Sequence, residues 1–220
     1  EDKTYQIQTF SGADLKNSCD ILAAKSVKVR KIIENYGYPE FEDRPKGFAG
    51  LVRLILEQQV SLASALAVLE KLTKRIGRIT PENILLLEDV RFRDLGVSRQ
   101  KKRYIRILAE EIISGRLDLE DLEEKPENEI RKTLTSITGI GSWTCDCYLL
   151  LHLRRIDIFP AGDLALVKAL KENALIKKDA DKKLIEQTAR AFSPCRSVLA
   201  LILWHAYIQK RGVKIKRQCS

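Results

Sequence analysis

The stretch SITGIGSWTCDCYLLLHL, residues 136–153, contains the feature on which the fold depends. Gly139 and Gly141 stand on either side of one isoleucine, between two segments whose apolar residues have helical spacing. Glycine is unfavourable inside a helix but suits a tight turn. The pair therefore predicts a helix, a short hairpin anchored in the core by Ile140, and a second helix that begins near Ser142.

A turn of this kind leaves amide N–H groups without partners at the N-terminus of the second helix. Those amides and the helix dipole attract phosphate, and the missing side chains of the two glycines let a DNA backbone come close. Contacts with phosphates position a protein on DNA without reading its sequence. The alternative is purely structural: a glycine ends the first helix and a short turn follows.

The rest of the pattern is helical nearly throughout, and we predict an all-α fold. Apolar residues recur at three- and four-residue steps through residues 48–77 and again through residues 98–115. Only the segment YQIQTF, residues 5–10, has weak strand alternation. With 220 residues, the chain has room for one large domain or two small ones.

Composition restricts the class of protein. A formal net charge of +9 favours a polyanionic partner, although solubility alone also explains it. The longest uncharged apolar run, Val198–Trp204, is too short to cross a bilayer, so we expect an intracellular protein with no membrane partner. The five cysteines form no regular framework and the two histidines are isolated, so we expect neither disulfides nor a metal centre built from them.

Four ordered segments resemble the helix-hairpin-helix/Gly-Pro-Asp (HhH-GPD) DNA glycosylase superfamily. The first is the hairpin stretch together with RRIDIFPAGDLAL, residues 154–166. The others are LVRLILEQQVSLASA, LGVSRQKKRYIRILAEEI and PCRSVLALILW. Together they cover roughly residues 46–208. The resemblance is closest to the alkylpurine branch, the AlkA- and Mag-like 3-methyladenine DNA glycosylases.

The resemblance implies a bilobal helical fold. One lobe would span residues 50–155 and end in the helix-hairpin-helix motif; the other would combine residues 1–49 with residues 156–220. The motif would lie at the cleft between the lobes, and the cleft would hold Asp163, which matches the catalytic aspartate of the family. Sequence alone makes Asp163 an ordinary helix-start residue. The two roles are compatible, because a helix N-terminus keeps a carboxylate ionised.

The implied chemistry is hydrolysis of an N-glycosidic bond. The sugar acquires oxocarbenium character, which a fixed carboxylate stabilises in a water-poor site. Asp163 would supply this charge and would either activate the attacking water or only stabilise the cation. Two other acids lie nearby in the sequence; we interpret Asp157 as a loop residue and Asp146 as a helix-surface residue.

Three residues bear on what the enzyme would lack. Trp143 stands where bifunctional relatives carry a nucleophilic lysine, so the resemblance implies a monofunctional enzyme without strand cleavage. Cys195 and Cys219 alone cannot supply the four cysteines that the iron–sulfur branch of the family uses. We therefore expect no cluster and no required cofactor.

A base inside a duplex must be rotated out and its place filled before it can react. Gln58 and Gln59 match the segment that probes the duplex in the family, with Gln59 at the wedge position; an exposed helix junction is the alternative. The base pocket would be lined by Trp143, Trp204 and Cys147. Indole rings favour an electron-deficient, alkylated purine through cation–π attraction, whereas simple core packing is the other interpretation of Trp204.

The DNA backbone would be gripped by the hairpin and by a basic helix start. The candidate contacts are Gly139, Ile140, Gly141, Ser142, Ser98, Arg99, Lys101 and Lys102. A basic helix face is, however, usually just solvated. Relatives also bind a monovalent cation, Na⁺ or K⁺, through hairpin carbonyls, and the matching positions are Thr135, Ile137 and Gly139. That ion would bridge to phosphate and take no part in the reaction.

Three functions are consistent with these residues. The first is a DNA glycosylase of base excision repair that removes alkylated purines, such as 3-methyladenine and 7-methylguanine, from double-stranded DNA. The second is the same scaffold acting on deaminated or oxidised bases. The third is a non-catalytic helix-hairpin-helix DNA-binding protein, against which the position of Asp163 argues. One protein for each lesion makes a monomer the expected state.

Overall fold

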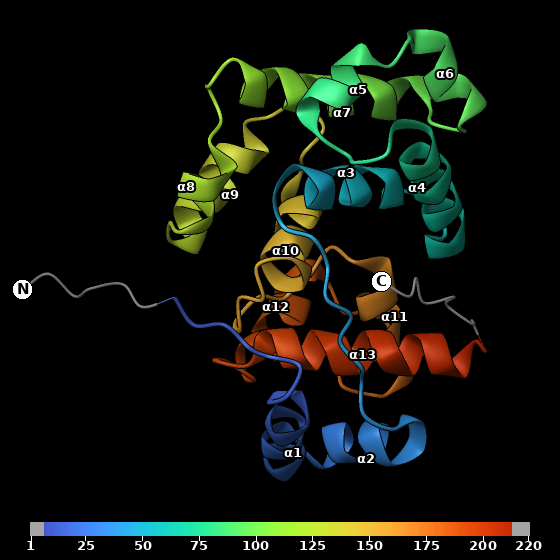
Figure 1. The fold of residues 1–220 in the computed structure, drawn as a ribbon. Helices are drawn as coiled ribbons and strands as arrows, with labels where there is room; N and C mark the ends of the chain where they lie inside the picture. Colours follow the sequence, from blue (N-terminus) through green and yellow to red (C-terminus); the bar gives the residue numbers. More distant parts are fainter. Residues whose placement is uncertain (1–6, 213–220) are drawn as a thin grey trace, which may run out of the picture. The chain divides into compact units, whose positions relative to one another are not determined.

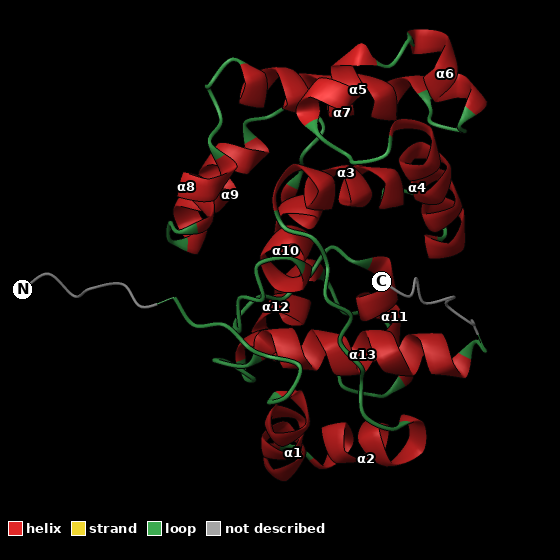
Figure 2. Cartoon of the chain, in the orientation of Figure 1, coloured by secondary structure: helices red, strands yellow, loops and turns green. Residues whose placement is uncertain are grey.

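The computed structural model describes residues 7–212, and within them every regular element is a helix. This part of the chain contains thirteen helices, whose arrangement is drawn in Figures 1 and 2. The prediction of an all-α fold is confirmed. None of these helices combines the length and the apolar character needed to cross a membrane.

The weak strand candidate at residues 5–10 becomes a single β-bridge. Thr9 pairs with Arg155 in antiparallel fashion, flanked by two backbone hydrogen bonds of 3.0 Å, from Phe10 to Arg154 and from Ile156 to Gln8. Two of the candidate's residues, 5 and 6, lie outside the described part of the chain, as does Cys219.

The chain divides into two compact units, which we name by the residues discussed below. The hairpin unit comprises residues 44–148, and the aspartate unit comprises residues 1–43 together with 149–220. The lobe boundaries predicted from the sequence, at residues 49 and 155, lie a few residues further along the chain. The predicted cleft between two lobes stays a prediction.

The hairpin unit is built around α3. Its helices are α3 (Gly47–Glu57), α4 (Leu62–Ile76), α5 (Pro81–Leu86), α6 (Asp89–Asp94), α7 (Arg99–Ile113), α8 (Leu119–Glu123), α9 (Glu127–Thr135) and most of α10 (Ser142–Leu151). Helix α3 contacts α4, α7 and α8, and α7 also packs along α5 (Figure 1). Residues 50–56 of α3 are all buried, because this helix is apolar on nearly every face.

The aspartate unit is built around α13 (Arg196–Lys210). Helices α1 (Leu15–Lys25), α2 (Val27–Tyr36), α11 (Leu164–Glu172) and α12 (Lys182–Arg190) all contact it. Residues 197–203 of α13 are buried, so the apolar run noted in the sequence is the core of this unit. Trp204, the next residue, is only half-buried.

Candidate active site

The glycine hairpin between α9 and α10 has the predicted form. Helix α9 ends at Thr135 and α10 begins at Ser142. The amide of Ile140 donates to the carbonyl of Ile137 at 3.0 Å, and the side chain of Ile140 is 3% exposed, so it anchors the turn as expected. Gly139 has φ +98°, in the left-handed region that side chains disfavour.

The two glycines differ in what surrounds them. A Cβ atom on Gly139 would lie 2.1 Å from Cγ of Tyr104 in α7, so the packing of the chain itself requires glycine there. A Cβ atom on Gly141 would meet nothing within 4 Å. Only Gly141 therefore leaves open space in which an outside group can reach the backbone, whereas the gap at Gly139 is filled by an aromatic ring.

The two glutamines between α3 and α4 point in different directions. Gln58 was expected to probe the duplex, but its side-chain amide is engaged inside the unit, where it donates to the carbonyl of Gly139 at 2.9 Å and to Oγ1 of Thr144 at 3.0 Å. The donor group of Gln58 is thus already occupied by the hairpin, and a role of this residue in probing the duplex stays a prediction. Gln59 is exposed and has φ +56°, in the left-handed region that side chains disfavour.

The basic start of α7 is partly used for internal contacts. The hydroxyl of Ser98 caps the helix by accepting from the amide of Lys101 at 3.2 Å. The ammonium group of Lys101 donates to the carbonyl of Leu56 at 2.7 Å, and partial burial lowers the pKa of this group. Lys102 pairs with Asp89 at 2.6 Å, whereas Arg99 is exposed. Lys101 and Lys102 thus have protein partners that the sequence did not reveal.

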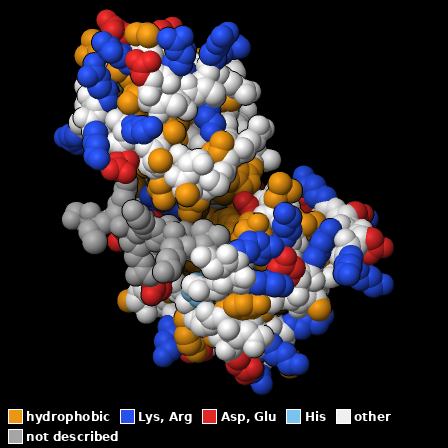
Figure 3. All heavy atoms as spheres, turned by 90° about the vertical axis from the view of Figure 1, so that its right-hand side faces the viewer, with side chains coloured by type: hydrophobic (Ala, Val, Ile, Leu, Met, Phe, Trp, Pro, Cys, Tyr) orange, Lys and Arg blue, Asp and Glu red, His pale blue; other side chains and the backbone are white. Residues whose placement is uncertain are grey.

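Lys and Arg side chains are spread widely over one face of the molecule. Figure 3 shows them across the visible face, interspersed with fewer Asp and Glu side chains. The excess positive charge of the chain is therefore distributed over many positions on that face.

Asp163 begins α11 in the aspartate unit. One oxygen of its carboxylate, Oδ1, accepts from the amide of Leu166 at 2.9 Å, the ordinary contact of an N-cap. The same oxygen accepts from the indole N–H of Trp204 in α13 at 3.1 Å. Asp163 is half-buried, and its carboxylate is oriented by two N–H donors from two helices. Asp163 is thus more than a helix cap, because α13 also holds it.

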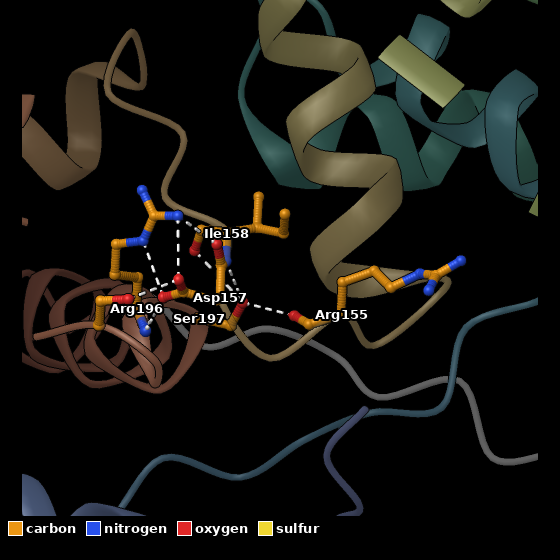
Figure 4. A network of polar contacts seen from close by, with 6 residues as sticks. Arg155, Asp157, Ile158, Arg196 and Ser197 are labelled. Carbon is orange, nitrogen blue, oxygen red and sulfur yellow. Dashed lines mark hydrogen bonds and ion pairs between the residues drawn. The ribbon is translucent and has the colours of Figure 1, made fainter. Parts of the chain in front are cut away.

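The loop before Asp163 is fastened to the start of α13. Asp157 accepts from Nε of Arg196 at 2.8 Å and from Oγ of Ser193 at 2.7 Å, and Arg196 also donates to the carbonyl of Asp157 at 2.7 Å. Ser197 adds a second tie, since its hydroxyl donates to the carbonyl of Arg155 at 2.6 Å (Figure 4). The interpretation of Asp157 as a loop residue agrees with this, and its contacts define the path of the chain toward Asp163.

The contacts of Asp157 with Arg196 and Ser193 predict that the stability of the fold decreases at acid pH. Partial burial alone would raise the pKa of the Asp157 carboxyl, but the hydrogen bonds from Arg196 and Ser193 outweigh it and hold that pKa below its ordinary value. The carboxylate thus stabilises the fold fully above the unfolded pKa of about 3.9, and this contribution disappears as pH falls through the lower folded pKa.

Asp157→Asn should lower the melting temperature at neutral pH and flatten its decline toward acid pH. Thermal melts between about pH 7 and about pH 3 measure this slope. Asp179→Asn, at an exposed position, is the matched control. If the melting temperature of Asp157→Asn declined with falling pH as steeply as that of the wild type, the contacts of the Asp157 carboxylate would contribute nothing to stability.

The remaining candidates occupy different environments. Trp143 is half-buried at the second position of α10, and Cys147 is 1% exposed in the core of that helix. Asp146, interpreted as a surface residue, instead forms an ion pair with Arg131 and is half-buried.

Of the three hairpin carbonyls expected to bind a cation, those of Ile137 and Gly139 each accept a hydrogen bond within the protein. In residues 7–212 no group of three or more His, Cys, Asp or Glu side chains is placed so that it could bind a metal ion.

Some contributors to the site gave no signal in the sequence. Thr144 and Tyr104 hold the hairpin, and Arg196 holds the loop that leads to Asp163. Each acts through a partner dozens of residues away, so neither periodicity nor a local motif marks it. Chemically, the aspartate unit presents a fixed carboxylate beside an indole, and the hairpin unit presents a helix N-terminus behind an open glycine.

Comparisons with known proteins identify the family to which the chain is similar. The family model described as HhH-GPD superfamily base excision DNA repair protein matches residues 52–195. A DNA-3-methyladenine glycosylase of Saccharomyces cerevisiae is 26% identical over 228 aligned positions, which cover 86% of this chain and 73% of the yeast protein.

Two solved structures are similar over nearly the whole chain. The DNA-3-methyladenine glycosidase of Bacillus halodurans has 30% identity and a TM-score of 0.70, and the match covers 92% of this chain and 93% of that one. The 3-methyladenine DNA glycosylase of Schizosaccharomyces pombe, in complex with abasic DNA, has 24% identity and a TM-score of 0.78, with 86% and 95% covered. At that identity the second likeness shows the fold alone.

Proposed function

Because the chain belongs to the HhH-GPD superfamily of base excision DNA repair proteins, we propose that it is a monofunctional DNA glycosylase that releases alkylated purines from duplex DNA. The observation that carries this proposal is the carboxylate of Asp163, held by the amide of Leu166 and the indole N–H of Trp204. The glycosylases named above as relatives support the choice of 3-methyladenine and related bases.

The reaction requires little beyond a fixed negative charge. As the N-glycosidic bond lengthens, the deoxyribose becomes positive, and a carboxylate already oriented by two donors stabilises it without further reorganisation. An alkylated purine carries positive charge and leaves readily, so strong acid catalysis is not needed. Asp163 also orients the water that attacks the sugar carbon. The half-buried ring of Trp204 offers a face that attracts a cationic base.

The enzyme we propose hydrolyses the base and leaves the strand intact. A lyase needs an amine nucleophile next to the sugar, and the position just after the hairpin holds Trp143. The hairpin amides would hold the phosphates, the exposed Gln59 would fill the gap left by the everted nucleotide, and one monomer would act on each lesion.

No cofactor enters the proposed reaction. The hairpin carbonyls of Thr135, Ile137 and Gly139 have oxygen donors of the type that hard cations such as Na⁺ or K⁺ prefer. Two of them already accept one hydrogen bond each, which leaves each a second lone pair for an ion. Such an ion would bridge the hairpin to a phosphate and stay outside the chemistry.

Chromatography of the bases released from methylated duplex DNA tests the proposal. We expect free 3-methyladenine and 7-methylguanine, followed by strand breaks only after heating in alkali. Breaks that form without alkali would contradict the absence of lyase activity. Release from duplexes containing uracil or hypoxanthine alone would replace the alkylpurine assignment, and binding without release would leave a DNA-binding protein.

A further inference from the structure

The turn between α3 and α4 is tied directly to the glycine hairpin. The amide nitrogen of Gln58 has two N–H groups, and both are used: one donates to the carbonyl of Gly139 at 2.9 Å and the other to Oγ1 of Thr144 at 3.0 Å. The tie spans more than eighty residues of sequence. Thr144 is 2% exposed, so its hydroxyl has no access to water as an alternative partner.

The end of helix α3, directly before this turn, is also held by helix α7. Lys101 in α7 donates to the carbonyl of Leu56, in the last turn of α3, at 2.7 Å. The ring of Tyr104, one turn further along α7, fills the space beside Gly139. Helix α7 thus contacts both the end of α3 and the hairpin, and Gln58 joins the α3–α4 turn to the hairpin directly.

Gln59 shows the consequence of these contacts. It has φ +56°, a backbone conformation that is unfavourable for a residue with a side chain and that persists only where the surroundings impose it. The side chain of Gln59 is exposed, although the preceding residue, Gln58, has its side-chain amide bonded inside the protein. A flexible turn would relax this backbone, so the contacts of Gln58 keep Gln59 in place.

We propose that Gln58 is a positioning residue, whose amide joins the α3–α4 turn to the hairpin so that Gln59 and the open backbone at Gly141 form one rigid surface for DNA. The first half of this inference concerns the protein alone. The second half, that the surface holds DNA, rests on the proposed function.

Hydrogen exchange of the free protein tests the first half. In Gln58→Leu, the hydrogen-bonded amides of the hairpin, those of Ile140 and Cys145, should exchange about tenfold faster, which corresponds to the loss of one or two hydrogen bonds. Amides of α5 and α7 in the same unit should keep their wild-type rates. Gln59→Leu, the matched control, should leave the hairpin unchanged. Equal hairpin exchange in Gln58→Leu and wild type would overturn the proposal.

Two milder variants keep the test valid if Gln58→Leu does not fold. Gln58→Glu preserves the shape of the side chain but removes both N–H donors, and Thr144→Val removes one acceptor. Each should accelerate exchange of the Ile140 and Cys145 amides, Gln58→Glu more than Thr144→Val. Unchanged exchange in both variants would equally overturn the proposal.

Affinity for a short duplex containing an abasic-site analogue tests the second half. Gln58→Leu should weaken binding about tenfold, because the gripping surface loses its fixed geometry. If Gln58→Leu exchanges faster at the hairpin but the wild type binds no duplex, the proposed function is contradicted. The inference that Gln58 joins the turn to the hairpin would then still hold. Unchanged affinity of Gln58→Leu, in a wild type that binds duplex, would refute the positioning of DNA by Gln58.

Discussion

Asp163→Asn should reduce the rate of base release from alkylated duplex by about a thousandfold, as expected when a preorganised charge is removed from a developing sugar cation. Asparagine caps helices as well as aspartate does, so its oxygen can still accept from the amide of Leu166 at the start of α11. The fold and the affinity for duplex should therefore persist while the chemistry is lost. Single-turnover release of methylated bases measures the effect.

The chain contains a matched control for this substitution. Asp181 caps α12 in the same way, with its carboxylate accepting from the amide of Leu184 at 2.8 Å. Asp181→Asn should change neither base release nor duplex affinity. Trp204→Phe tests the indole donor, since it keeps an aromatic ring but loses the N–H; release should slow by about tenfold. Wild-type activity in Asp163→Asn would remove this carboxylate from the mechanism.

Gly139→Ala should destabilise the protein by about 3 kcal/mol, whereas Gly141→Ala should cost about 1 kcal/mol or less. The first substitution forces a side chain into φ +98° and places its Cβ against the Cβ and Cγ atoms of Tyr104, which cannot swing aside like the end of a long side chain. The second places a methyl group where nothing lies within 4 Å. Thermal unfolding should show a fall of about 10 °C for Gly139→Ala.

The same pair of variants separates structure from DNA contact. Gly141→Ala should keep its melting temperature nearly unchanged yet bind duplex about tenfold more weakly, because the methyl group intrudes where a phosphate would reach the amides. Equal duplex affinity in Gly141→Ala and wild type would show that no phosphate approaches this residue. A stable Gly139→Ala protein would show that the ring of Tyr104 yields more easily than its contacts indicate.

Local chemistry explains why much of the candidate site was visible in the sequence. A glycine pair between two helical patterns has few other uses, and the hairpin lies where it was predicted, with Ile140 buried beneath it. An aspartate that follows Pro-Ala-Gly and precedes an apolar helix is an N-cap by its own propensity, and Asp163 caps α11. Both features depend on residues within four positions of each other.

The direction in which a side chain points, and the partner to which it bonds, depend by contrast on residues far away along the chain. Gln58 and Gln59 are chemically identical, yet one side chain enters the protein and the other leaves it, because Gly139 and Thr144 offer acceptors on one side only. Lys101 looked like a phosphate contact and instead reaches a helix-end carbonyl.

The sequence by itself determined the all-α fold, the hairpin and the helix-start carboxylate, since helical periodicity, turns and caps are decided by neighbouring residues. Only the tertiary structure decided that Trp204 donates to Asp163, that Arg196 fastens the loop before it, and that Gln58 serves the hairpin. Those contacts join segments more than thirty residues apart. They form only when packing brings together donors and acceptors that no local pattern relates.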